Sequence, residues 1–156
     1  MIQIDVPGDK VYQLEHLVLD YNGTLACDGR LLPGVGQRLV ALAKHLKVHV
    51  LTADTFGTAG NELAGIPGHL TTLPPGDQAA GKQAVVQALG ADRVVAVGNG
   101  RNDQLMLVTA VLGIAVVQEE GAAAATLMAA DVVAPSIAAA LDLLLWPLRL
   151  TATLRV

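Results

Sequence analysis

The feature that most constrains this chain is a short apolar run that ends abruptly in an aspartate, within residues 17–25 (LVLDYNGTL). An apolar run without polar alternation is typical of a strand buried on both faces of a parallel sheet. Ligands of such sheets bind beyond the carboxyl ends of the strands. Asp20 therefore falls where a catalytic carboxylate would stand. Gly23 would let the backbone approach a bound anion, although the same pattern also occurs in ordinary turns.

Short apolar strands alternate with helical segments along the rest of the chain, and 53% of the residues are hydrophobic while 15% are charged. This pattern predicts an α/β fold with a doubly wound, Rossmann-like and mainly parallel sheet in one domain, residues 1–156. Hairpins are expected at the N-terminus (1–14) and at 25–32. Strands are expected at 17–19, 48–51, 69–73, 93–97, 113–117 and 132–133. Helices are expected at 35–46, from about 55 to 63, and at 77–89, 104–111, 121–130 and 136–145.

Composition excludes several classes of partner and setting. The net charge is −4 without a basic run, so nucleic acid is not expected as a partner. Cys27 is the only cysteine, which excludes an internal disulfide and favours a cytoplasmic protein. No signal peptide or membrane-spanning run is visible, so no membrane partner is expected. The four histidines form no metal-binding sequence pattern.

Polar residues follow three of the expected core strands: Asp20, Thr52, and the segment 99–103 (NGRND). A parallel sheet brings these strand ends to one edge, and Lys82 lies on the helix that precedes the third strand. A carboxylate, a hydroxyl, a lysine and a second carboxylate suit phosphoryl transfer through an acyl phosphate. Asp20 would attack phosphorus, Thr52 and nearby amides would hold the phosphoryl oxygens, Lys82 would offset negative charge, and Asp103 would hold Mg²⁺.

The order and spacing of these residues resemble the four motifs of the haloacid dehalogenase (HAD) superfamily: DYNGTL, VLT, Lys82 and GNGRND. Within it, LTADT and GNGRNDQLML look most like P-type ATPases, here without their membrane helices. The resemblance implies a HAD-like fold. It also implies a site with catalytic, phosphate-binding and Mg²⁺-binding residues. The catalytic set is Asp20, Asn22, Thr52 and Lys82; the phosphate-binding set is Gly23, Thr52, Ala53 and Lys82; the Mg²⁺ set is Asp20, Asn22 and Asp103, supported by Asn99 and Asn102.

Two positions depart from the family pattern. Asn22 stands where phosphatases of the family usually carry an acid/base aspartate, and an amide cannot exchange a proton near neutral pH. An acid–base contribution of roughly 10²–10⁴ in rate would then be missing. Asn99 stands where the fourth motif often has aspartate, so Mg²⁺ should bind more weakly than in relatives with the full motif.

The spacing between the motifs leaves no room for a cap domain. An uncapped site admits large substrates unless another subunit covers it, so the expected partner is a phosphorylated small molecule or macromolecule, and a homo-oligomer is possible. The resulting hypothesis is a cytoplasmic, Mg²⁺-dependent phosphatase with a phosphorylated Asp20 that is slow and favours good leaving groups. The alternative is a catalytically degenerate regulatory protein that binds phosphate or Mg²⁺. A phosphoaspartate receiver domain fits less well, because residues 14–17 (LEHL) lack its acidic pair.

Overall fold

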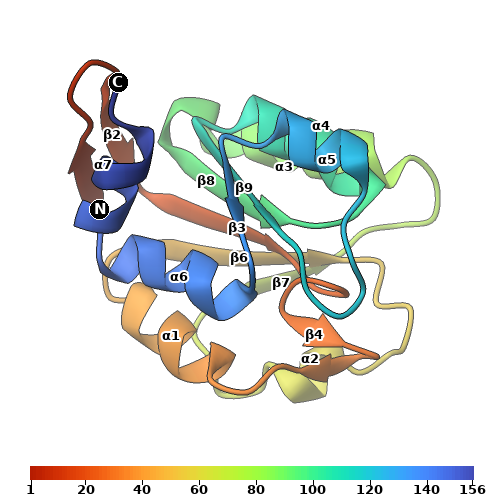
Figure 1. Ribbon diagram of the computed structural model, residues 1–156. Helices are drawn as coiled ribbons and strands as arrows, with labels where there is room; N and C mark the ends of the chain where they lie inside the picture. Colours follow the sequence, from red (N-terminus) through yellow and green to blue (C-terminus); the bar gives the residue numbers. More distant parts are fainter.

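A six-stranded sheet in which every neighbouring pair is parallel runs through the centre of the computed structural model, which describes residues 1–156 (Figure 1). The strand order is β10-β9-β8-β3-β6-β7, so the first core strand lies in the middle. From β3 the chain builds outward through β6 and β7, then returns to add β8, β9 and β10 on the other side. The bounds are β3 His16–Asp20, β6 Lys47–Thr52, β7 His69–Thr72, β8 Val94–Gly98, β9 Leu112–Val116 and β10 Val132–Ala134.

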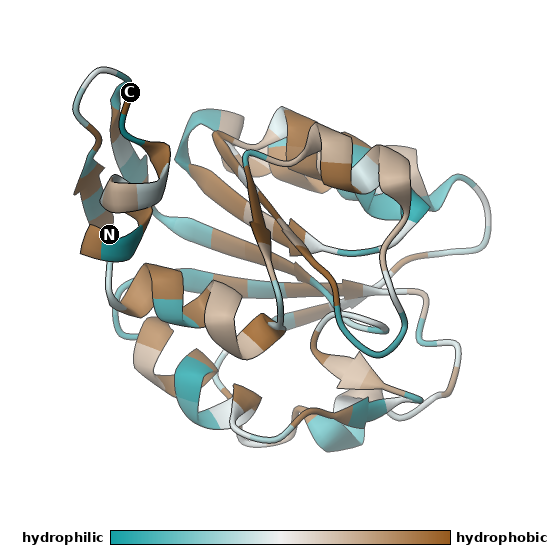
Figure 2. Cartoon of the chain, in the orientation of Figure 1, coloured by the Kyte–Doolittle hydropathy of each residue, from teal (hydrophilic) through white to brown (hydrophobic).

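Helices cover both faces of this sheet, with α1 and α6 on one face and α3, α4 and α5 on the other (Figure 1). Alternate residues of a strand point to opposite faces. Leu17 and Leu19 accordingly join the core under α1 and α6, while Val18 joins the core under α3 and α4. Figure 2 shows the apolar strands between these layers. The bounds are α1 Val35–Leu42, α3 Gln78–Leu89, α4 Gln104–Thr109, α5 Ala124–Ala129 and α6 Ile137–Leu145.

Both predicted hairpins are present. The N-terminal hairpin consists of β1 (Ile2–Asp5) and β2 (Val11–Leu14), and it forms a separate antiparallel sheet. The second consists of β4 (Ala26–Cys27) and β5 (Arg30–Leu31), and we call it the flap hairpin. Asp28 and Gly29 make its turn with positive φ angles of 51° and 78°, which is the geometry that favours Asp-Gly in tight hairpins.

Helix α7 (Leu148–Leu154) was not predicted from the sequence. It begins directly after Pro147, because proline fits the first turn of a helix although it ended the preceding one. The new helix packs on the N-terminal hairpin, where the Thr151 hydroxyl donates to the Asp5 carbonyl at 3.0 Å and the Val156 amide donates to the Pro7 carbonyl at 3.2 Å. The two ends of the chain therefore lie together (Figure 1).

Two predicted helices begin later than expected. Helix α2 (Ala59–Glu62) starts at Ala59 rather than near residue 55, because Asp54 adopts a φ of 51° and its carboxylate accepts from the Ala59 amide. Helix α5 starts at Ala124 rather than at Gly121. The intervening segment is held extended by hydrogen bonds from the Ala123 amide to the Asn99 carbonyl and from Asn99 Nδ2 to the Gly121 carbonyl.

The predicted absence of a cap domain is confirmed. Between β3 and β6 the chain forms only the flap hairpin and α1, and between β6 and α3 only α2 and β7. None of the helices is by itself both long and apolar enough to cross a membrane. Helices α6 and α7 meet the length and composition requirement only as a pair, and they are bent by 104° at the break between them.

Candidate active site

Three charged side chains meet at the carboxyl end of the sheet. Lys82 Nζ lies 2.6 Å from Asp20 Oδ1 and 2.6 Å from Asp103 Oδ1. Asp20 ends β3 and, by the alternation along that strand, points to the same face as Val18, where α3 carries Lys82. Asp103 lies in the turn that follows β8, the strand next to β3. The fold thus brings together three residues that the sequence separates widely.

The Lys82–Asp20–Asp103 group is buried and carries an excess negative charge. The exposed fractions of the three residues are 1% for Lys82, 7% for Asp20 and 0% for Asp103. Burial, followed by the Asp103 carboxylate, raises the pKa of Asp20 to about 7, although Lys82 and Thr24 act in the opposite direction. Burial alone would lower the pKa of the Lys82 amine, but the two carboxylates outweigh it and hold the pKa above its usual value.

Both oxygens of the Asp103 carboxylate accept hydrogen bonds from protein groups. Its Oδ2 atom accepts hydrogen bonds from the backbone amides of Asn99 (2.9 Å) and Gly100 (2.8 Å), and its Oδ1 atom accepts from Lys82. These contacts close the turn after β8 and fix the position of the lysine. Asn102, from the same turn, is exposed and makes no side-chain hydrogen bond within the protein.

Thr24 connects the first and fourth motifs. Its hydroxyl lies 3.1 Å from Asp20 Oδ2 and 3.2 Å from Asn99 Oδ1, and the residue is fully buried. Thr24 therefore holds the second oxygen of the predicted nucleophile and faces the Asn99 carbonyl oxygen. The sequence analysis assigned no role to Thr24, although its place in the DYNGTL motif was a signal that could have found it.

Free hydrogen-bond donors surround Asp20. The backbone amides of Tyr21, Asn22 and Ala53 donate to no protein group. Thr52 is buried at the end of β6, and its hydroxyl oxygen accepts from the Asp54 amide at 2.8 Å, which leaves the hydroxyl proton available. Amides and a hydroxyl gathered beside a lysine are suited to hold phosphoryl oxygens.

Gly23 shapes the turn rather than donating to a ligand. Its own amide donates to the Ala26 carbonyl at 2.8 Å, and its φ of 81° lies in the left-handed region. A Cβ atom at this position would lie 2.5 Å from Asn99 Nδ2 and 2.6 Å from Glu120 Oε2. Both the conformation and the close approach therefore require glycine here.

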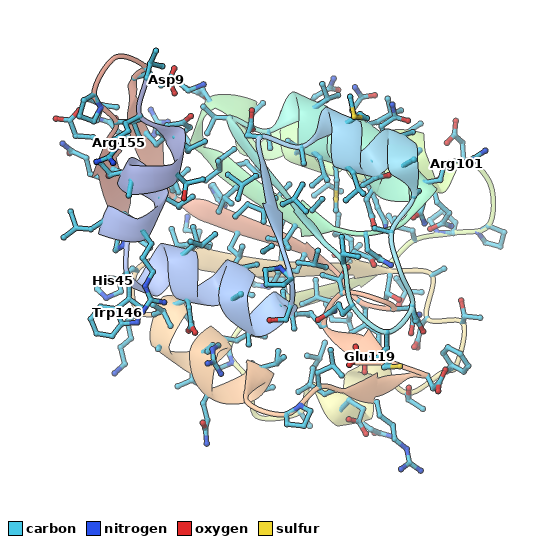
Figure 3. All side chains as sticks on the ribbon, in the orientation of Figure 1. Asp9, His45, Arg101, Glu119, Trp146 and Arg155 are labelled. Atoms are coloured by element: carbon cyan, nitrogen blue, oxygen red, sulfur yellow. The ribbon has the colours of Figure 1, made fainter.

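Residues 118–120, which follow β9, lie over this turn, and no sequence pattern predicts their part in the site. Gln118 Nε2 donates to the carbonyls of Gly23 (3.1 Å) and Thr24 (2.7 Å), and its Oε1 accepts from the Ile137 amide at 2.8 Å. The Asp28 amide of the flap hairpin lies 3.4 Å from Glu120 Oε1. Figure 3 shows the neighbouring Glu119 beside the flap hairpin.

The oxygen atoms at this site are suited to bind a Mg²⁺ ion. Asn22 Oδ1 is buried without a hydrogen-bond partner, and the Asn22 backbone carbonyl accepts no protein hydrogen bond. Asp20 Oδ2 and Asn99 Oδ1 both contact the Thr24 hydroxyl, so they lie on the same side of the site. Carboxylate and carbonyl oxygens are the ligands that Mg²⁺ prefers, and one lysine does not balance two buried carboxylates.

Solved structures of phosphatases share this architecture. A cobalt-bound 3-deoxy-D-manno-octulosonate (KDO) 8-phosphate phosphatase from Haemophilus influenzae superposes with a TM-score of 0.70 at 13% identity, over 86% of this chain and 88% of that chain. The Moraxella catarrhalis enzyme, in complex with magnesium, phosphate and KDO, gives 0.66 at 14% identity over 91% and 87%. A proposed HAD superfamily (subfamily III A) hydrolase from Legionella pneumophila gives 0.64 at 19% over 90% and 88%. The chain has the HAD fold.

Two archaeal relatives from Methanocaldococcus jannaschii match parts of the sequence. Uncharacterized protein MJ0073 is 49% identical over 63 residues, which are 40% of this chain and 68% of that protein. Uncharacterized protein MJ0072 is 44% identical over 39 residues, which are 25% of this chain and 89% of that protein. The chain belongs to their family. No protein-family model matches it.

Proposed function

We propose that this HAD-fold chain is a Mg²⁺-dependent phosphatase that acts through a phosphorylated Asp20. The observation that carries the proposal is the contact of Lys82 with two buried carboxylates, Asp20 and Asp103, beside unpartnered amides at the carboxyl end of the sheet. The shared fold with KDO 8-phosphate phosphatases supports the same reaction type.

In the first step an oxygen of the ionised Asp20 forms a bond to phosphorus while the bond to the leaving oxygen breaks, and the electron pair stays on the leaving group. In the second step water attacks phosphorus, the Asp20 carboxylate is released and inorganic phosphate departs. The amides of Tyr21 and Asn22, with the Thr52 hydroxyl, would hold the phosphoryl oxygens. Lys82 would favour the ionised form of Asp20 and offset the charge of the phosphoryl group.

Mg²⁺, when bound, would neutralise charge on the phosphoryl oxygens. Asp20 and the Asn22 carbonyl are proposed ligands. The sequence assigns the third position to Asp103 and a supporting role to Asn99, but we propose that these two roles are exchanged. Asp103 accepts three hydrogen bonds, two from backbone amides that close its own turn and one from Lys82. Asn99 Oδ1 has only the Thr24 hydroxyl as a partner, and Asp20 Oδ2 contacts the same hydroxyl.

Two features of the site, Asn22 and the absence of a cap, bear on the choice of substrate. Asn22 cannot protonate a leaving group, so phosphate esters with good leaving groups should react fastest. The site is covered only by the flap hairpin and the segment after β9. Such an open site does not restrict substrate size. We propose phosphorylated small molecules first because the Moraxella catarrhalis enzyme, which has the same fold, holds phosphate and KDO.

The decisive experiment is hydrolysis of an aryl phosphate by the pure protein with Mg²⁺. Asp20→Asn, purified in the same way, sets the background from contaminating phosphatases. Turnover that disappears in this variant and on chelation of Mg²⁺ is expected. Release of phosphate at equal rates by the wild type and Asp20→Asn would overturn the proposal.

A second candidate function is that of a binding protein that keeps the site but no longer turns over phosphate esters. Asn22 and Asn99 favour this candidate, because each replaces a carboxylate of the family pattern. Beryllium fluoride bound to Asp20 mimics the phosphorylated aspartate. An adduct that forms in the wild type and not in Asp20→Asn, together with no hydrolysis of any phosphate ester in a broad screen, would select this reading.

A further inference from the structure

Three of the four histidines come together on neighbouring strands although the sequence places them far apart. His49 on β6 is directly opposite His69 on β7, and on its other side it is opposite Val18 on β3. His16 lies two residues before Val18, so it points to the same face of the sheet. This face is the one that α3 and α4 cover further along the sheet. The three imidazoles thus form a row across β3, β6 and β7, which we call the histidine row.

The first two rings are already at the separation of two ligands on one metal ion. His16 Nδ1 lies 3.1 Å from His49 Nε2, so the two rings share a hydrogen bond. Two nitrogens bound tetrahedrally to Zn²⁺ at about 2.0–2.1 Å would be roughly 3.3 Å apart, so an ion that replaces the shared proton would require little movement of these two rings. The ring centroids of His16 and His49 are 5.3 Å apart, and those of His49 and His69 are 5.6 Å apart. His16 is 9% exposed. His69 is exposed, and its ring would have to turn toward the other two to bind the same ion, because the ligand atoms of the three histidines do not all lie within 4.8 Å of one another.

The surroundings of His16 and His49 lower the pKa of both rings and so favour the neutral form of imidazole, which is the form that binds metal. Burial, followed by the neighbouring His16, His69 and Lys47, lowers the pKa of His49 to about 4. Burial and Lys47 also lower the pKa of His16, against a smaller opposite effect of Glu15. Neither ring is hydrogen-bonded to a carboxylate. Lys47 is exposed and Arg93 pairs with Glu15, so neither cation is fixed against the rings.

We propose that His16, His49 and His69 form a binding site for a divalent transition-metal ion of the Zn²⁺, Ni²⁺ or Cu²⁺ class. Imidazole suits these ions, whereas the oxygen donors around Asp20 suit Mg²⁺, so the two sites select different metals. The ion would join the edge strand β7, all four residues of which are exposed, to the buried strand β3. The proposal does not depend on phosphatase activity.

A second group of potential metal ligands lies where the flap hairpin meets the segment after β9, and metal binding there must be distinguished from binding at the histidine row. The ligand atoms of Cys27, Asp28 and Glu120 lie within 4.8 Å of one another. Two of these residues are exposed acids and the third is a single cysteine, and nothing else at that place points to a bound ion. A soft metal ion could nevertheless reach the Cys27 thiol, so a Cys27→Ser variant belongs in the experiment.

The test is calorimetric titration of the full chain with Zn²⁺ in excess Mg²⁺, which occupies the oxygen-lined site. We expect one Zn²⁺ per chain in the wild type and in Cys27→Ser. Affinity should fall at least about tenfold in His49→Gln and in His69→Gln, because each loses a ligand. His45→Gln is the matched control: His45 is the remaining histidine, is exposed, lies near Trp146 (Figure 3), and its ring pairs with none of the other three. It should bind Zn²⁺ like the wild type.

Two further measurements test the metal site even if one of the variants folds poorly. His69 is exposed on an edge strand, so His69→Gln should keep the wild-type melting temperature without metal while losing the stabilisation that Zn²⁺ gives the wild type. Imidazole NMR signals of His16 and His49 should shift on addition of Zn²⁺, and that of His45 should not. Zn²⁺ binding abolished by Cys27→Ser, binding equal in all histidine variants, or no saturable binding by the wild type would each overturn the proposal.

Discussion

The Nζ atom of Lys82 lies 2.6 Å from Asp20 Oδ1 and 2.6 Å from Asp103 Oδ1 in a buried environment. The lysine is therefore the only positive charge in direct contact with two carboxylates that have almost no access to water. Two neighbouring negative charges in a medium of low dielectric repel strongly. Lys82 should consequently be needed for the stability of the fold as well as for the proposed reaction.

Lys82→Met should lower the free energy of unfolding by about 3–5 kcal/mol at pH 8, because it leaves buried charge without a partner. Part of this loss should be recovered at pH 5, where Asp20 can take up a proton. Urea unfolding at the two pH values measures both effects. The exposed residue Lys44 provides the control, Lys44→Met, and a loss for Lys82→Met no larger than for this control would contradict the prediction.

The raised pKa of Asp20 predicts a pH dependence with a defined sign. The folded, metal-free chain holds the Asp20 proton up to a pKa of about 7, against 3.8 for an ordinary aspartate. The stabilisation from this group is therefore complete below about pH 4 and is lost as the pH rises through 7. Unfolding in chelator from pH 5 to 8 should show this trend in the wild type. Asp20→Asn should lack it, and parallel curves for the two proteins would exclude it.

Mg²⁺ binding should show the opposite trend, because the ion competes with the Asp20 proton. Affinity should rise as the pH approaches 7, with about one proton released per ion well below that pH, and should level off above it. Calorimetry in buffers of different ionisation enthalpy measures the proton release directly. Equal affinity at pH 5.5 and pH 8 would show that Asp20 does not bind the ion.

The arrangement of strands and motifs follows from local sequence because each signal is short-ranged. The apolar runs that end in Asp20 and Thr52 predict buried parallel strands, and parallel strands end at a common edge. Asp28-Gly29 predicts the tight flap turn. The face on which Asp20 meets Lys82 then follows from the position of Asp20 in β3, because successive side chains of a strand point to opposite faces of the sheet.

Other features depend on long-range register or on irregular segments, and these could not be predicted. The histidine row requires His49 to lie opposite His69 rather than opposite Leu70, a shift of one residue that would turn a ring to the other face. Gln118 reaches the Gly23 turn from a loop with no regular pattern. Ala-rich sequence predicts a helix from Gly121, but the bond from Asn99 Nδ2 to the Gly121 carbonyl holds that residue outside it.

Asn99→Asp should strengthen Mg²⁺ binding by about tenfold or more, because it adds a carboxylate where Asn99 Oδ1 now faces Asp20. Asp103→Asn is the informative comparison. It removes charge from a residue that holds Lys82 and two backbone amides, so it should cost stability more than it changes affinity. Calorimetry and urea unfolding on both variants separate the effects. A large loss of Mg²⁺ affinity in a stably folded Asp103→Asn, with no gain in Asn99→Asp, would return the third ligand position to Asp103.

Asn22→Asp should raise turnover of alkyl phosphates, up to the roughly 10²–10⁴ that a positioned acid and base contribute. Asn22 is two residues after Asp20, and its side-chain oxygen is buried without a hydrogen-bond partner. A carboxylate at position 22 would occupy the same space, from which it could protonate a leaving group. Aryl phosphates should gain much less, because their leaving groups need no proton. Rates for the two ester classes in the wild type and in Asn22→Asp give the comparison. An equal gain on both esters would point to metal binding rather than to proton transfer, and an unchanged alkyl rate would show that position 22 does not limit the reaction.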